Sequence, residues 1–213
     1  MPAAVSVILI LVLLVVFTAG GFYLRFRTYE RIGALLDAGK VDEAGRKLDG
    51  VVARSVLAPF ARERLRFRAL ALRGERDNLV QQMNLLMKMK LNANERSIVL
   101  ADGFNAFAQL GDYKHCKRIV DEMASAGFAD KALAAYRRHF DLVLAHKTEG
   151  WKALENTYAT LSGKRRGYVA YLLSKVHETL NDGEAGRYAA EAARLYGMPE
   201  SELDRRINVN TSL

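Results

Sequence analysis

The residues best suited to chemistry in this chain are its four histidines and its single cysteine. His139 and His146 are seven positions apart and could share one face of a helix, but no third ligand accompanies them for a metal ion. Cys116 stands alone, which excludes an internal disulfide and a cysteine-based zinc site. The chain also lacks a phosphate-binding glycine loop, a nucleophile elbow and an HExxH motif. The sequence therefore predicts no catalytic residue, no metal, no cofactor and no enzymatic activity.

Arginine is the other chemically active residue type that gathers in this sequence. The segment 61–73 contains five arginines and one glutamate. On a helix, Arg62, Arg66 and Arg73 share one face, which could lie on anionic lipid or meet an acidic protein partner. Nucleic acid is not the expected partner, because no aromatic stacking motif accompanies the charge. The alternative is a solvated face whose arginine stems pack on neighbouring residues.

The elements that must position these residues begin with an N-terminal apolar segment. Residues 3–24 carry no charge and are rich in Val, Ile and Leu. As a helix these 22 residues reach roughly 33 Å, enough for a hydrocarbon layer of roughly 30 Å. We expect a transmembrane signal anchor over residues 1–24. Two alternatives are a cleavable signal peptide, which would carry Lys or Arg before the apolar stretch, and a buried core helix, which would not be apolar on every face.

The charges that follow the apolar segment predict its orientation. Arg25, Arg27 and Arg31 come directly after it, so the positive-inside rule places the N-terminus outside and residues 25–213 in the cytoplasm. All 32 Lys and Arg and all 24 Asp and Glu lie beyond residue 24, so the net charge of +8 belongs to the remainder of the chain. A basic domain beside a membrane is attracted to anionic headgroups and to acidic partners.

A repeat organises the rest of the chain. Short turns between amphipathic runs recur at intervals of 35, 37, 37 and 35 residues, and their markers are Gly39, Gly74, Gly111, Thr148 and Gly183. Glycine can end a helix in the left-handed conformation, so each marker is interpreted as the turn of a helical hairpin. About five hairpins fit between Thr28 and Leu203. Such short units must stack on one another to bury their apolar faces, as in an α-solenoid.

Breaks between the hairpins fall at residues that suit helix ends. Pro59 can occupy a first helical turn, and Asn94 and Asp130 are candidate N-caps. Strict alternation of β-branched residues, which would indicate strands, is not found. The predicted fold is therefore all-α.

The unit from Ser97 to Met123 carries the repeat pattern most fully. Its turn is Gly111-Asp112-Tyr113, and its apolar or small helix positions are Leu100, Phe107, Cys116, Val120 and Met123. In these features the chain resembles the tetratricopeptide repeat family, over roughly residues 28–197. The resemblance implies that Cys116 is a packed core residue.

The same resemblance implies a concave groove, lined by the first helix of each pair, that holds an extended peptide. The groove positions carried over to this chain are Arg64, Arg68, Asn105, Gln109 and either Arg137 or Arg138, of which we choose Arg138. Arginine forks and an Asn amide on one surface could hold an acidic segment or a C-terminal carboxylate. The alternative for the arginines is again a solvated face.

Together these patterns predict a membrane anchor (1–24), a repeat domain (25–203) and a short tail (204–213). The expected function is that of a noncatalytic membrane-anchored scaffold or adaptor, which binds partner proteins through a tetratricopeptide-like groove. Two alternatives stay open. One is an extracytoplasmic envelope or translocon-associated assembly chaperone, and the other is a basic peripheral surface that binds anionic lipid.

Overall fold

The computed structural model describes the backbone of residues 2–209 and the side chains of residues 13–209. Over this part of the chain every regular element is a helix and no strand forms, which confirms the all-α prediction. The chain forms two compact units, Met1–Met89 and Lys90–Leu213. The boundary between the units lies inside the region 25–203 that the sequence predicts as one repeat domain. The end of the predicted tail, residues 210–213, lies outside the described residues.

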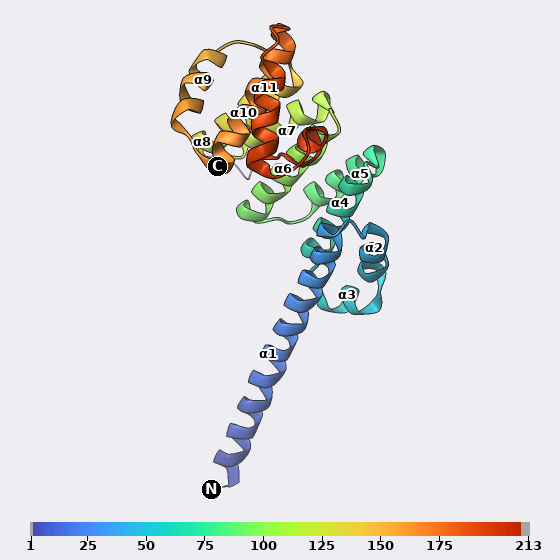
Figure 1. The fold of residues 1–213 in the computed structure, drawn as a ribbon. Helices are drawn as coiled ribbons and strands as arrows, with labels where there is room; N and C mark the ends of the chain where they lie inside the picture. The colour runs from blue at the N-terminus through green and yellow to red at the C-terminus, as the bar shows by residue number, and fades with distance from the viewer. Residues whose placement is uncertain (1, 210–213) are drawn as a thin grey trace. The chain divides into compact units, whose positions relative to one another are not determined.

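The first unit contains five helices (Figure 1), which are α1 (Pro2–Asp37), α2 (Val41–Asp49), α3 (Val51–Val56), α4 (Pro59–Arg73) and α5 (Arg76–Lys88). The C-terminal part of α1 pairs with α2, and α4 packs against both of them and against α5. Ile32 and Leu36 are one helical turn apart and face this core together. The other buried residues of the core are Ala44, Leu48, Ala53, Leu57, Leu65 and Ala69.

The N-terminal part of α1 carries large apolar side chains that the rest of the unit leaves uncovered. The helix is 36 residues long and extends beyond α2 to α5 (Figure 1). Phe17 is 84% exposed, and the other exposed apolar residues of this stretch are Leu13, Leu14, Val15, Val16, Phe22, Tyr23, Leu24 and Phe26. Across the described residues, no helix combines the length and the apolar character needed to cross a membrane. The predicted anchor spans residues 1–24, and its side chains up to residue 12 lie outside the described ones.

The second unit continues the pattern of paired helices. Its α-helices are α6 (Ala93–Gln109), α7 (Tyr113–Ser125), α8 (Asp130–His139), α9 (Trp151–Thr160), α10 (Gly163–Leu180), α11 (Ala185–Tyr196) and α12 (Leu203–Arg206). A π-helix, η1 (Phe140–Leu144), extends α8, and a 3₁₀-helix, η2 (Glu200–Glu202), precedes α12. The pairs α6–α7 and α10–α11 pack closely, and α10 also contacts α9 and η1.

A turn separates two consecutive helices at each of the five positions that the glycine spacing predicts, although the two helices at the fourth turn, α8 and α9, do not pack along each other. Four of the markers adopt the left-handed conformation that favours glycine, and these are Gly39, Gly74, Gly111 and Gly183. In the fourth pair the left-handed glycine is Gly150, two residues after the marker Thr148. The spacing of turns was therefore a sound guide to the order of helices.

The core positions predicted in the Ser97–Met123 unit are buried. Leu100, Phe107, Cys116 and Met123 are fully enclosed, and Val120 is nearly so. Cys116 lies against α6, where its Sγ is 3.7 Å from the carbonyl oxygen of Phe104. Burial raises the pKa of the Cys116 thiol, which keeps it protonated.

Two of the three predicted helix starts need correction. Pro59 is the first residue of α4, as expected. Asn92, rather than Asn94, caps α6, because its side chain accepts the N–H of Glu95 while the Glu95 carboxylate accepts the N–H of Asn92. Asp130 is the first residue inside α8, and Ala129 occupies the cap position. In both cases the helix begins one or two residues away from the residue that the sequence favours.

Candidate functional site

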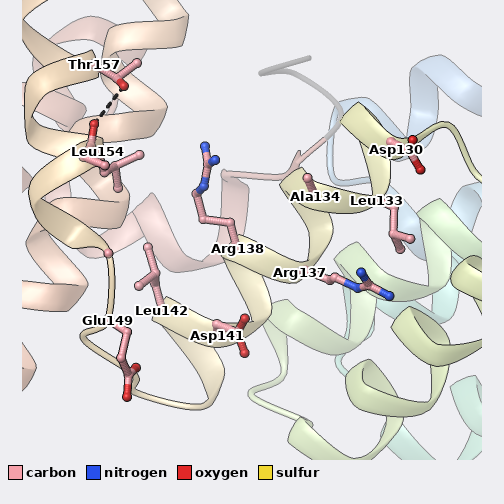
Figure 2. A pocket seen from close by; sticks show the side chains of 12 residues that line it. Asp130, Leu133, Ala134, Arg137, Arg138, Asp141, Leu142, Glu149, Leu154 and Thr157 are labelled. Atoms are coloured by element: carbon pink, nitrogen blue, oxygen red, sulfur yellow. Dashed lines mark hydrogen bonds between the residues drawn. The ribbon is translucent and has the colours of Figure 1, made fainter.

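The fourth helix pair differs from the other four in that its two helices do not pack along each other. The helix α9 packs against α10 instead of α8. Of the ten residues of α9 only Leu154 is buried. A cleft of about 670 Å³ lies between α8 with η1 on one side and α9 on the other (Figure 2). This cleft is our candidate site.

The local sequence explains why this pair opens. The π-helix η1 adds a wider turn to the end of α8, and residues 145–150 then connect it to α9. By comparison, residues 110–112 suffice to join α6 and α7. The Lys147 backbone N–H donates to the Asp141 carbonyl at 2.8 Å, and its ammonium pairs with the Asp141 carboxylate at 2.8 Å. These bonds fold the connection back on η1 rather than over the cleft.

Arg138 is the charged residue that projects between the two helices. Figure 2 shows its guanidinium in the space between Leu154 of α9 and Ala134 of α8. Within the described residues Arg138 makes no hydrogen bond or ion pair. Arg137, the alternative that the repeat pattern allowed, points away from α9 (Figure 2). Both arginines therefore line the cleft, and Arg138 is the one that projects toward α9.

A smaller hollow continues the cleft toward α10. It measures about 320 Å³ and shares Ala134, Arg138 and Thr157 with the larger one. Its charged lining consists of Lys131, Arg138 and Arg165, all basic. The larger hollow has three acidic residues, Asp130, Asp141 and Glu149, beside Arg137 and Arg138. Asp141 is paired with Lys147, and Asp141 and Glu149 point away from Arg138 (Figure 2). Only in the smaller hollow, therefore, are all the charged lining residues basic.

Beneath this cleft lies an aromatic cluster centred on His139. The ring is 3% exposed, and its Nδ1 lies 3.0 Å from the Tyr168 hydroxyl. It stacks on Tyr168 and meets Phe104 edge-on. Burial lowers the pKa of His139 to about 4, although the charge of Asp204 opposes that shift. His139 is therefore a neutral packing residue.

His139 and His146 line the same hollow, which lies beside the C-terminal end of α6. Among the described residues no group of three or more His, Cys, Asp or Glu side chains is placed to hold a metal ion.

The predicted groove residues of α6 lie beside the last residues that the structure describes. The Val209 backbone N–H donates to the Asn105 Oδ1 at 3.0 Å. Gln109 lines a hollow of about 340 Å³ that Ile207 borders on its other side. Asn105 therefore contacts Val209 and Gln109 lines the same hollow as Ile207, while Arg138 lines the α8–α9 cleft.

The arginines predicted in α4 lie in the first unit, where they pair with acids of α1 and α2. Arg66 contacts Asp49 at 2.7 Å and Arg73 contacts Asp42 at 2.7 Å. Arg68 forms an ion pair with Asp37. Arg64 is half-buried on the same helix. These contacts tie α4 to its neighbours, a role that the composition of the segment did not indicate.

Glu63 is the residue of this segment whose importance the sequence analysis missed. It is 6% exposed and accepts hydrogen bonds from Arg62 at 3.1 Å, Arg66 at 2.8 Å and Gln82 at 2.9 Å. Burial by itself raises its pKa, but the hydrogen bonds from Gln82 and Arg62 and the charges of both arginines outweigh it, so the pKa is lowered overall. The available signal was a single acid among five arginines.

The basic residues that follow the apolar segment lie on the exposed part of α1. Arg27 donates to the Tyr23 hydroxyl at 3.0 Å, one turn earlier in the helix. Arg25 and Arg31 are exposed on the same helix. All three arginines thus lie between the exposed apolar stretch and the core of the first unit, as their order in the sequence requires.

Comparison with protein-family models, with curated proteins and with solved structures finds no match for this chain. The resemblance to tetratricopeptide repeats thus stays a prediction from the residues. The function has to be argued from the geometry of the two units.

Proposed function

We propose that this protein is a noncatalytic scaffold or adaptor, anchored to a membrane by residues 3–24 and built from tetratricopeptide-like hairpins stacked as an α-solenoid. The N-terminus lies outside and the repeat region lies in the cytoplasm. The protein holds an acidic segment of a partner protein in the α8–α9 cleft. The observation that carries the proposal is the uncovered apolar surface of α1, because lipid covering this surface would attach the scaffold to the membrane.

The support for the anchor is the exposure of large apolar side chains on every side of one helix. Phe17, Phe22 and Val16 are between 63% and 84% exposed. Burying one such side chain stabilises by about 1.5–3 kcal/mol, and extended apolar surfaces of this kind mark membrane or protein contacts. A protein partner would cover one stripe of the helix, whereas lipid covers its full circumference. The arginines at 25, 27 and 31 fit the cytoplasmic end.

The support for partner binding is Arg138, which makes no ion pair within the described residues and projects into a cleft that is partly lined by leucines. Leu133, Leu142 and Leu154 line the hollow into which Arg138 projects. A guanidinium binds a carboxylate in a bidentate way, and the apolar walls would contact the side chains that flank this carboxylate. The matching ligand is an amphipathic segment with an acidic residue. Binding through an ion pair and apolar contacts needs no catalytic side chain.

Site-specific photo-cross-linking of the full chain in its own cells tests this function. A photoreactive amino acid at Ala153, which lines the cleft, is expected to give a discrete adduct with a partner protein. Arg138→Glu in the same chain is expected to reduce this adduct by about tenfold, because it reverses the charge that meets the acid. The matched control carries the photoreactive residue at Lys117, which is exposed on α7. The same adducts from both positions, or none from Ala153, would contradict binding in the cleft.

A further inference from the structure

The last part of the chain that the structure describes occupies a surface of the second unit in the way that a bound peptide would. Residues 203–209, which we call the C-terminal segment, contain α12 and the residues up to Val209. The segment contacts α6 and borders a hollow lined by α6, η1 and α10. It comes after the last helix pair, α10–α11, and so is not part of any hairpin.

Polar contacts hold the segment at both of its ends. Near its start the Asp204 carboxylate accepts a hydrogen bond from the Tyr171 hydroxyl at 3.0 Å and one from the Lys175 ammonium at 3.1 Å. At its end the Val209 backbone N–H donates to Asn105 at 3.0 Å. The contacts at Asp204 recognise an acidic side chain, whereas the contact at Val209 involves only the backbone of the segment. Recognition of both kinds is typical of peptide binding.

Apolar side chains of the segment fill the space between those contacts. Leu203, Ile207 and Val209 are 4%, 3% and 0% exposed. The pattern is therefore a carboxylate with apolar residues three and five positions after it, at Asp204, Ile207 and Val209. The hollow of about 340 Å³ beside Ile207 leaves room for a larger side chain next to Gln109. The acid and apolar residues of the C-terminal segment thus indicate which kind of peptide this surface can bind.

We propose that the surface of α6, η1 and α10 beside the C-terminal segment is a peptide-binding surface, which the segment itself occupies. A partner segment with the same spacing of an acid and apolar residues binds there by displacing the C-terminal segment. The short connection from α11 keeps the segment at an effective concentration on the order of millimolar. A free peptide therefore competes poorly until the cis contacts are weakened. This surface is separate from the α8–α9 cleft and does not depend on the anchor.

The test uses the full chain in detergent and a fluorescent peptide of residues 199–209. Fluorescence anisotropy is expected to show weak binding to the unaltered chain. Asp204→Asn in the chain removes the contacts with Tyr171 and Lys175, so the peptide is expected to bind about tenfold more tightly. The matched control is Glu202→Gln, which is expected to leave binding unchanged, because Glu202 directly precedes the segment and pairs at 2.7 Å with Arg206 of the segment rather than with the surface beneath it.

A second substitution, on the surface that receives the peptide, is expected to weaken peptide binding. Adding Asn105→Ala to the Asp204→Asn chain removes the acceptor for the peptide backbone, and the gain in affinity is expected to disappear. Circular dichroism then reports whether each variant keeps its fold. Peptide binding that is equal in the Asp204→Asn and unaltered chains would overturn the proposal. So would unfolding of the Asp204→Asn chain, because the segment would then be an integral part of the core.

Discussion

At the scale of single residues, two buried polar side chains, Glu63 and His139, connect neighbouring helices. Glu63 joins α4 to α5 through Gln82 and neutralises two arginines of its own helix. His139 joins η1 and α8 to α10 through Tyr168. Neither residue is accessible enough to meet a ligand. Their expected contribution is to stability.

Replacement of Glu63 by Gln is expected to lower the free energy of unfolding by about 1–3 kcal/mol, because Arg62, Arg66 and Gln82 lose a charged acceptor. Chemical denaturation of the full chain in detergent measures this change. Glu43→Gln is the matched control in the same unit, since Glu43 pairs only with Lys47 at 3.9 Å on the surface. Equal effects of the two substitutions would mean that Glu63 is not the centre of the network.

The lowered pKa of Glu63 also predicts how this difference varies with pH. The unfolded chain binds the proton near the ordinary value of 4.5, while the folded chain binds it only at lower pH. The contribution of Glu63 to stability is therefore complete above that value and is lost as the pH falls below it. The stability difference between the unaltered chain and Glu63→Gln is expected to shrink in this range. A difference that stayed constant down to about pH 3 would contradict the shift.

His139 predicts a second pH effect at higher pH. Its pKa is lowered from 6.5 to about 4, so the unfolded state takes up a proton first as the pH falls. Stability is therefore expected to decrease between about pH 6.5 and pH 4. In His139→Phe this part of the slope should be absent, even though Tyr168 loses its partner and the overall stability falls. Thermal melts across the pH range measure the slope, and an unchanged slope would contradict the assignment.

At the scale of helices, the turn glycines connect sequence and fold most directly. Gly111 has a φ of 66° and open space around its α-carbon, so Gly111→Ala is expected to cost about 1–2 kcal/mol from backbone strain alone. Gly33 lies inside α1, also with open space, so Gly33→Ala is expected to stabilise by up to about 1 kcal/mol through helix propensity. Differential scanning calorimetry is expected to show a lower stability for Gly111→Ala and a higher stability for Gly33→Ala. Two changes of the same sign would contradict this reading of the turns.

The helices could be predicted from the sequence because their signals are local. Glycine spacing lies within each unit of the repeat, so the order of helices followed from it. Core positions such as Leu100 and Met123, which are buried, followed from the resemblance to tetratricopeptide repeats. The caps were displaced by one or two residues, since Asn92 and Asn94 both suit a helix start. The π-helix at Phe140–Leu144 has no comparable signal.

The candidate site was less predictable, because its features depend on contacts between distant residues. The pairing of Arg66 with Asp49 spans 17 positions, and the contact of Asn105 with Val209 spans 104. Neither separation is encoded in a repeat. Arg138 was placed by the repeat pattern, but the opening of the cleft around it follows from the longer connection after η1.

At the scale of the whole molecule, the proposed function combines attachment at one end with partner binding in the second unit. The net charge of +8 lies entirely outside the apolar segment, and several arginines of α4 already have acidic partners. The prediction that Arg62, Arg66 and Arg73 bind anionic lipid stays open to a liposome experiment. The central claim is the anchor, because orientation and access to partners both follow from it.

Alkaline extraction of membranes from cells that express the full chain tests the anchor most directly. The unaltered chain is expected to stay in the membrane pellet. Leu14→Arg with Phe17→Arg is expected to move it to the supernatant, since each arginine costs about 2.5–3.5 kcal/mol at the centre of a membrane helix. Val51→Arg with Val52→Arg, which changes two equally exposed apolar residues of α3, is expected to leave the chain in the pellet. An unaltered chain that is fully extracted at alkaline pH would contradict the account.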